Sequence, residues 1–276
     1  MDTKKVWFVT GASKGLGLSL VNKLLQEGYQ VTATSRNKND ILSKTGPNPN
    51  LLAMTVDITD ETAVKNALDE TVSAFGKIDV VINNAGYMLL GSLEEVSASE
   101  FHQSMSINVY AFLNVIRHAM PYLREQKSGH IVNFSSVAGH LGSGCAGSYN
   151  AAKFAIVGLS EALAREVEPL GIKVTIVSPG FFRTSFLEKG GFASAQNSIE
   201  GYATNQLIDR MNQINGKQPG NPDKLAAVLM AIVEEENPPL HLLMGQDAYE
   251  MVTNNRKMQD AEFEQWKAIS FSTNFD

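Results

Sequence analysis

The chain has little cysteine and no long hydrophobic run, and each of these absences limits its class. Cys145 is the single cysteine, so an internal disulfide is excluded and a reducing compartment is expected. No stretch approaches the roughly 18 consecutive apolar residues that a membrane-spanning helix needs. Residues 1–5 lead directly into the apolar run 6–9 and lack the features of a signal peptide. These observations predict a cytoplasmic protein.

Charge and histidine patterns exclude further classes. The basic residues are dispersed and the formal net charge is -6, so we expect no nucleic-acid and no membrane partner. The five histidines have no HxxxH or HExxH spacing and lie near no cluster of cysteine or acidic residues, so no metal site is predicted. No G-x-S-x-G elbow surrounds Ser136, which argues against a hydrolase nucleophile there.

Short apolar runs alternate with helical patterns, which is typical of βαβ units and a parallel sheet. Most runs are continuous, as expected for strands that are covered on both faces. Strands are predicted at 5–9, 30–34, 51–56, 80–83, 130–134, 172–177 and 240–244. Helices are predicted at 15–27, 60–75, 97–126 and 149–169. The pattern predicts an α/β fold in one catalytic domain over residues 1–276.

Residues from about 184 to 223 depart from this rhythm and are rich in Gly, Ser, Asn and Gln. Loops of this length in compact domains are usually functional or disordered. The segment follows the sixth predicted strand, so it should start at the edge of the sheet where open α/β folds bind ligands. We predict a mobile substrate lid, with a surface excursion as the alternative. The Asp- and Asn-rich stretches near the C-terminus are expected to be solvated loops.

Three glycines, Gly11, Gly15 and Gly17, lie where the first strand turns into a helix. Glycine permits a tight turn and lets the backbone approach a pyrophosphate, while the helix N-terminus offers free N–H groups to the anion. The spacing is G-x-x-x-G-x-G, so the generic dinucleotide fingerprint G-x-G-x-x-G is only partly met. The preceding strand and the following amphipathic helix supply the context that the motif needs. A glycine turn made for backbone reasons alone is the alternative.

The choice of cofactor depends on the end of the second strand, where an acidic residue would hold the ribose hydroxyl of NAD. This chain has Thr34, Ser35 and Arg36 there, and Lys14 lies inside the glycine turn. Two cations without a carboxylate favour the 2′-phosphate of NADP(H), because arginine grips phosphate well. Solvated surface charges are the alternative reading. We predict NADP(H) in preference to NAD(H).

With these residues the chain resembles the short-chain dehydrogenase/reductase family over nearly its whole length. The resemblance rests on Thr10 to Gly17, Asp57, Asn83 to Gly86, Asn108, Ser136, Tyr149 with Lys153, and Pro179-Gly180 followed by Thr184. It implies a Rossmann-type, doubly wound, seven-stranded sheet with helices on both faces. The cofactor-binding set that it implies is Gly11, Ser13, Lys14, Gly15, Leu16, Gly17, Ser35, Arg36, Asp57, Ile58, Asn84, Ala85, Gly86, Tyr149, Lys153, Pro179, Gly180 and Thr184.

The resemblance also implies what some of these residues contact. Asp57 should contact the adenine amine, and the turn 83–86 should hold the sheet and flank the adenine ribose. Pro179, Gly180 and Thr184 should meet the nicotinamide. The resemblance is weakest after about Ser185, so it does not transfer a substrate.

Tyr149 and Lys153 are four residues apart at the start of a predicted helix, so they share one face. A free tyrosine has a pKa near 10, and a neighbouring ammonium should lower it. We therefore predict that Tyr149 is the general acid in carbonyl reduction and the base in the reverse reaction. In the family the lysine also anchors the nicotinamide ribose. A half-buried tyrosine beside a solvated lysine is the alternative.

Two further catalytic residues are predicted. Ser136, at the end of the strand predicted at 130–134, should donate to the substrate oxygen as charge develops there, and adjacent Ser135 is the competing candidate. Asn108 lies within a predicted helix, where asparagine is unfavourable. In the family this position holds a water that relays protons to the lysine, whereas a capping or surface asparagine is the alternative from the residues alone. Cys145 is expected to be buried and unreactive.

The pattern as a whole predicts an NADPH-dependent carbonyl reductase that also catalyses alcohol oxidation. The alternatives are an NAD-dependent alcohol dehydrogenase and a non-catalytic NADP-binding regulatory protein. The substrate should be a small molecule in an apolar pocket near Phe181, Phe182, Phe186 and Leu187, although these side chains could equally belong to the core. The long helices predict a homodimer or homotetramer. A C-terminal extension from about Ala248 could cover the pocket or lengthen an interface.

Overall fold

The computed structural model describes residues 4–188 and 190–275, and it contains a parallel sheet in the order β3-β2-β1-β4-β6-β7-β9. All seven predicted strands are present, with ends displaced by at most two residues. The strands are β1 (Val6–Thr10), β2 (Gln30–Ser35), β3 (Leu51–Thr55), β4 (Val80–Asn83), β6 (Gly129–Phe134), β7 (Ile172–Pro179) and β9 (His241–Met244). The predicted α/β fold with a doubly wound sheet is confirmed.

Strand β1 lies at the centre of the fold, with β2 on one side and β4 on the other. All five of its residues are buried, because helices cover both faces of the sheet. Trp7 and Val9 point into one core, while Phe8 between them points into the other. The strand order reverses between β1 and β4. In open α/β sheets a crevice forms at such a reversal, outside the carboxyl ends of the strands.

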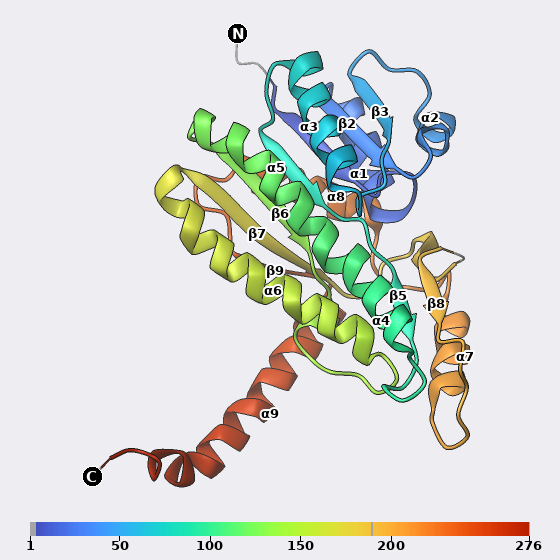
Figure 1. Cartoon of the computed structure of the whole chain (residues 1–276), viewed down its shortest axis with the longest axis vertical. Coiled ribbons are helices and arrows are strands. Elements are labelled where there is room, and N and C mark those ends of the chain that lie inside the picture. Colours follow the sequence, from blue (N-terminus) through green and yellow to red (C-terminus); the bar gives the residue numbers. More distant parts are fainter. Residues whose placement is uncertain (1–3, 189, 276) are drawn as a thin grey trace.

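Two helical layers enclose the sheet (Figure 1). Helices α1 (Gly15–Gln26) and α8 (Pro222–Glu234) pack on the core that contains Trp7. Helices α3 (Glu61–Phe75), α5 (Ala111–Gln126) and α6 (Gly147–Val167) pack on the core that contains Phe8. The short helix α2 (Lys38–Thr45) follows β2 and was not predicted. Asp60 caps α3 by accepting from two backbone N–H groups.

The helix predicted over 97–126 is interrupted. It begins with α4 (Ala98–Met105), which Ser97 and Glu100 cap reciprocally, and then passes through a π-helical turn (Ser106–Tyr110) before α5. The predicted helical span is present, but a π-helical turn divides it into two α-helices. Such π-helical turns often occur at functional sites, and this one contains Asn108.

The 184–223 segment has more regular structure than its composition suggested. Strand β8 (Phe192–Ser194) pairs in parallel with β5 (Met88–Leu90), and helix α7 (Thr204–Ile214) follows it. Figure 1 shows β5, β8 and α7 grouped at one side of the molecule. The segment therefore packs on the body through a small second sheet.

The C-terminal stretch forms α9 (Gln246–Phe271), a helix that projects from the body (Figure 1). The expectation of solvated loops here is wrong. Only Ala248 and Val252 of this helix are fully buried, so tertiary packing stabilises its first turns. The remaining turns depend on the helix propensity of their residues. Over the described residues, no helix combines the length and apolar character needed to cross a bilayer.

Candidate active site

A cavity of about 1680 Å³ opens at the carboxyl ends of the strands. The turns after β1, β2, β4, β6 and β7 all contribute to its wall, because the carboxyl ends of parallel strands meet at one edge. The cavity gathers the predicted site residues, with two exceptions. Gly17 and Asn108 are not among the described residues of its lining, and both lie directly behind it.

The glycine turn requires its glycines for two different reasons. Gly11 and Gly15 have φ angles of 67° and 59°, a region that side chains disfavour. Gly17 has ordinary helical geometry, but a Cβ there would lie 2.5 Å from the carbonyl oxygen of Gly11 and 2.6 Å from Nδ2 of Asn84. Close contact between the turn and its neighbour therefore excludes even a methyl group at residue 17.

Asn84 and Thr10 join the turns that follow β4 and β1. The Thr10 hydroxyl accepts from the backbone N–H groups of Asn84, at 3.0 Å, and Ala85, at 3.2 Å. Nδ2 of Asn84 donates to the carbonyl oxygens of Thr10 and Gly11, at 3.0 and 3.2 Å. These bonds hold the turn 84–86 against the glycine turn at the reversal of strand order.

Three cations gather beside the glycine turn. The pKa of Lys14 is lowered by burial first, and then by repulsion from Arg36 and Lys44, while Glu188 opposes the effect. A Cβ on Gly190 would lie 3.6 Å from Nζ of Lys14 and 3.8 Å from Nη2 of Arg36, so both cations reach the same place. Lys44 is held nearby because its Nζ donates to the carbonyl oxygen of Ser13 at 2.7 Å. A cluster of this kind suits an anion with more than one charge.

Sequence reasoning missed Lys44 because α2 was not predicted. The signal in the sequence was weak: Asn37 is a capping residue type, and its side chain accepts from the backbone N–H of Asn39. A helix of eight residues with little apolar character shows almost no periodicity. Asp57 follows β3, next to the end of β2, and it stays ionised because the hydroxyl and backbone N–H of Thr59 donate to it and lower its pKa.

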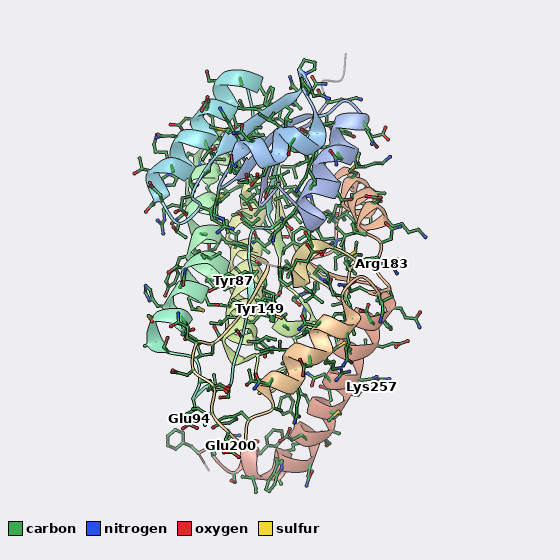
Figure 2. All side chains as sticks on the ribbon, turned by 90° about the vertical axis from the view of Figure 1, so that its right-hand side faces the viewer. Tyr87, Glu94, Tyr149, Arg183, Glu200 and Lys257 are labelled. Carbon is green, nitrogen blue, oxygen red and sulfur yellow. The ribbon has the colours of Figure 1, made fainter. Side chains whose placement is uncertain are left out.

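Tyr149 and Lys153 lie in the first turns of α6, with 8% and 4% of their surfaces exposed. In Figure 2, Tyr149 lies near the middle of the view, whereas Lys257 of α9 lies toward its edge. Nζ of Lys153 donates to the carbonyl oxygen of Phe134 at 2.9 Å and lies 5.6 Å from the centroid of the Tyr149 ring. The two side chains share one face of the helix, as their spacing predicted.

Burial dominates the electrostatics of this pair. It raises the pKa of Tyr149 to about 12, against a smaller opposing effect of a hydrogen bond with Ser136, and it lowers the pKa of Lys153 to about 8. The pKa of Tyr149 is therefore raised, not lowered as expected, because the loss of solvation outweighs the other effects. The phenol is therefore protonated at neutral pH, and most of the lysine still carries its charge.

The two adjacent serines make different contacts. Ser135 is buried and donates to the carbonyl oxygen of Lys153 at 2.9 Å, so its hydroxyl proton is engaged within the protein. Ser136 caps a short turn by accepting from Ala138 N–H at 3.2 Å, and it also hydrogen-bonds to Tyr149. The geometry thus favours Ser136 over Ser135 as the hydroxyl that shares a ligand with Tyr149.

Asn108 lies behind the cavity wall, in the π-helical turn. Its Oδ1 accepts from Tyr87 N–H at 3.0 Å, and its Nδ2 donates to the Tyr87 carbonyl at 3.0 Å and to Ser104 Oγ at 3.2 Å. A Cβ on Gly86 would lie 2.7 Å from Oδ1. The side chain of Asn108 therefore fixes the backbone of residues 86 and 87, and both alternatives from the sequence, a capping and a surface residue, are wrong.

Asp247 is a site-supporting residue that sequence reasoning missed. It lies in the first turn of α9, and its Oδ2 accepts from Phe181 N–H at 2.7 Å, beside Gly180. Met251, one turn later, lines the cavity. The start of the C-terminal helix therefore covers one edge of the cavity. The spacing between residues 180 and 247 gives no hint of this contact.

The apolar residues predicted near the pocket, Phe181, Phe182, Phe186 and Leu187, all line the cavity. Phe182 also packs against the core that contains Trp7. The group therefore contributes both to the cavity wall and, through Phe182, to the core. Cys145 is partly rather than fully buried, and it is not among the lining residues described. Within the described part of the chain, no three His, Cys, Asp or Glu side chains form a group that could hold a metal.

The family assignment follows from comparison with known proteins. The sequence profile of the short chain dehydrogenases matches residues 5–191, more than half of the chain. The chain belongs to the short-chain dehydrogenase/reductase family. It is therefore an oxidoreductase of the class that uses NAD(P) and acts on CH–OH groups. The resemblance drawn from the motifs and the predicted enzyme class are confirmed.

Two relatives with similar sequences cover most of this chain. It is 33% identical to oxidoreductase BOA17 of Botryotinia fuckeliana (strain B05.10), over 98% of this chain and 99% of the relative. It is 35% identical to the 3-ketodihydrosphingosine reductase of Bacteroides thetaiotaomicron, over 87% of this chain and 88% of the relative.

Solved structures share the fold. A short-chain dehydrogenase from Streptomyces avermitilis superposes with a TM-score of 0.89 and 32% identity, covering 98% of this chain and 100% of that one. ElxO with NADP bound superposes with a TM-score of 0.73 and 27% identity, covering 87% of this chain and 96% of that one. A dehydrogenase from Burkholderia phymatum in complex with NAD gives 0.81 and 23%, covering 95% of each chain, and it shows the likeness of the fold alone.

Two glycines in helices of this short-chain dehydrogenase should respond oppositely to alanine. Gly17→Ala should lower the free energy of unfolding by about 2 kcal/mol, because the new methyl group has no space beside Gly11 and Asn84. Gly158→Ala in α6 should raise it by about 0.5 to 1 kcal/mol, since nothing lies within 4 Å of that position. Urea unfolding measures both, and equal effects of the two substitutions would contradict the close contact at Gly17.

Proposed function

We propose that the protein is an NADPH-dependent reductase of ketones or aldehydes, which also oxidises the corresponding alcohols. The observation that carries this proposal is the position of Ser136, Tyr149 and Lys153 in the same cavity as the glycine turn. A protein that only binds a dinucleotide needs the turn but has no use for a buried proton donor beside it.

The residues at the glycine end fit an NADP molecule. Gly11, Ser13 and Gly15 line the cavity, so a pyrophosphate would lie against the N-terminus of α1, where backbone N–H groups and the helix dipole favour an anion. Lys14, Arg36 and Lys44 together suit the additional phosphate, and Asp57 would face the adenine. At the other end Pro179, Gly180 and Thr184 would border the nicotinamide, with Asp247 holding the backbone of the same segment.

Bound NADPH would supply the hydride that forms the new C–H bond at the carbonyl carbon. As the carbonyl π bond breaks, its oxygen takes the proton of Tyr149, which is available because the pKa of the phenol is about 12. Ser136 would donate a hydrogen bond to the same oxygen while negative charge develops there. The ammonium of Lys153 would favour the transient phenolate, which then regains a proton from solvent. Asn108 would hold residues 86 and 87 behind this group.

Replacement of Tyr149 by phenylalanine tests the proton donor. Tyr149→Phe should lower kcat for ketone reduction by about a hundredfold or more while leaving the Kd of NADPH nearly unchanged. NADPH absorbance gives the rate, and a fluorescence titration gives the Kd. Tyr110→Phe is the control, because Tyr110 is exposed and outside the described lining of the cavity. Unchanged turnover in Tyr149→Phe would refute the assigned mechanism.

The three cations should set the choice of cofactor. We expect higher kcat/KM with NADPH than with NADH, and Lys44→Ala should reduce this ratio about tenfold, because a charged hydrogen bond to phosphate is lost. Arg36→Asp should reduce it further, since a carboxylate repels phosphate and can bind a ribose hydroxyl. Initial rates with both cofactors measure the ratio. Lys38→Ala, an exposed position of α2, should leave it unchanged; a preference for NADH in the unaltered protein would overturn the cofactor assignment.

A further inference from the structure

Helix α7 has an apolar side that the protein itself covers only in part. Leu207, Ile208, Met211 and Ile214 are all half-buried, whereas the polar side chains between them are exposed. Leu207 and Met211 are one helical turn apart, and both line the active-site cavity. An amphipathic helix normally buries its apolar side against a core. Here part of that side faces the cavity instead.

A buried carboxylate fixes the start of α7. Glu95 is 1% exposed, and it accepts from the Thr204 hydroxyl, from Ile199 N–H at 3.0 Å and from Ser92 N–H at 2.8 Å. These bonds lower its pKa to about 2, with that from Thr204 having the largest effect, so Glu95 is ionised at neutral pH. Thr204 is the first residue of α7. The helix is therefore positioned over the cavity by charge-assisted hydrogen bonds, which are the strong ones.

Other contacts hold the 184–223 segment on both sides of α7. Glu100 accepts from Gln196 N–H at 2.9 Å, and Glu94 accepts from the Tyr202 hydroxyl. At the far end, the guanidinium of Arg183 donates twice to the Gln218 carbonyl, at 3.2 and 3.1 Å. Figure 2 shows Glu94 and Arg183 well apart, so the segment is fastened at two separate places.

Apolar side chains make up much of the wall around α7, and Glu100, His102 and Gln103 of α4 add polar groups to it. Met88 and Leu90 come from β5, Phe192 from β8, Leu141 from the loop before α6 and Met251 from α9. The cations lie at the glycine turn, at the other end of the proposed cofactor site. Pockets for one small molecule usually have volumes of roughly 300 to 1,000 Å³. At about 1680 Å³, this cavity has room for a dinucleotide together with a second ligand of considerable size.

We propose that the substrate is a ketone or aldehyde whose carbonyl carries an extended apolar group, and that Leu207 and Met211 of α7 cover this group. The inference rests on the proposed reductase function and names the substrate class for the same site. A second ligand of this kind would complete the burial that α7 lacks. Short, polar carbonyl compounds would leave the same apolar wall in contact with water, which is unfavourable.

A chain-length series of methyl ketones, from butan-2-one to decan-2-one, tests the proposal with the unaltered protein and NADPH. The kcat/KM should rise by up to about fourfold for each added methylene, the value expected when a methylene group is fully buried. A flat series with measurable reduction of butan-2-one would overturn the substrate class and leave the reductase function standing.

A binding measurement keeps the two proposals separate. Calorimetry with NADPH present, where an alcohol cannot react, should show tighter binding of decan-2-ol than of butan-2-ol, with a more negative heat-capacity change for the longer alcohol. Selective binding of decan-2-ol without turnover of any ketone would refute the reductase function and support the apolar site. Equal binding of the two alcohols would overturn the apolar site whatever the turnover.

Two matched substitutions in α7 locate the effect. Leu207→Asn should lower the kcat/KM ratio of decan-2-one to butan-2-one by about tenfold, because it places an amide where the apolar group should pack. Ile208→Asn introduces the same amide on the same helix at a half-buried position outside the described lining. It should leave the ratio unchanged, and equal effects of both substitutions would contradict the role of Leu207.

The buried carboxylate gives a further test. Glu95→Gln should raise KM for decan-2-one about tenfold without changing KM for NADPH, because an amide replaces one carboxylate acceptor with a donor and α7 loses its position. Glu200→Gln is the control, because Glu200 lies in the same segment but is exposed and outside the described lining of the cavity. Circular dichroism checks that both variants fold. If folded Glu95→Gln keeps the KM of the unaltered protein, α7 does not cover the substrate.

Discussion

The contact between the turns after β1 and β4 is the constraint on which the site depends. The Thr10 hydroxyl and the Asn84 amide join the two turns through four hydrogen bonds at 3.0 to 3.2 Å, and Gly17 has no room for a methyl group between them. This contact occurs where the strand order of the sheet reverses. It fixes the shape of the cavity wall at the glycine turn, where the proposed dinucleotide cofactor would lie.

Burial of Lys153 beside Tyr149 at one end of the cavity opposes folding. Lys153 is almost completely buried, and burial lowers its pKa to about 8 while raising that of Tyr149 to about 12. Desolvation of an ammonium opposes folding. The carbonyl oxygen of Phe134 offsets part of this cost by accepting a hydrogen bond from Nζ. Buried ionisable groups with shifted pKa values are typical of functional sites, which supports the role proposed for this pair.

The cavity combines two different environments. Cations at the glycine turn suit phosphate, whereas the walls made by β5, β8, α7 and α9 are apolar. The two ends come from different parts of the chain. Strand ends and the turns after them build the charged part, and the 184–223 segment with the start of α9 builds the apolar part. Loops vary more freely than the strands that they connect, so the apolar part should vary more among relatives than the charged part.

The sequence by itself determined the strands, the glycine turn and the pairing of Tyr149 with Lys153, because these depend on short spacings and local periodicity. Packing decided the rest. Lys44, Asp247 and Glu95 reach the site from elements that are distant in the sequence, and the direction of the Tyr149 pKa depends on burial. Spacing specifies neighbours along a helix or strand, whereas desolvation and contact across elements exist only once the chain has folded.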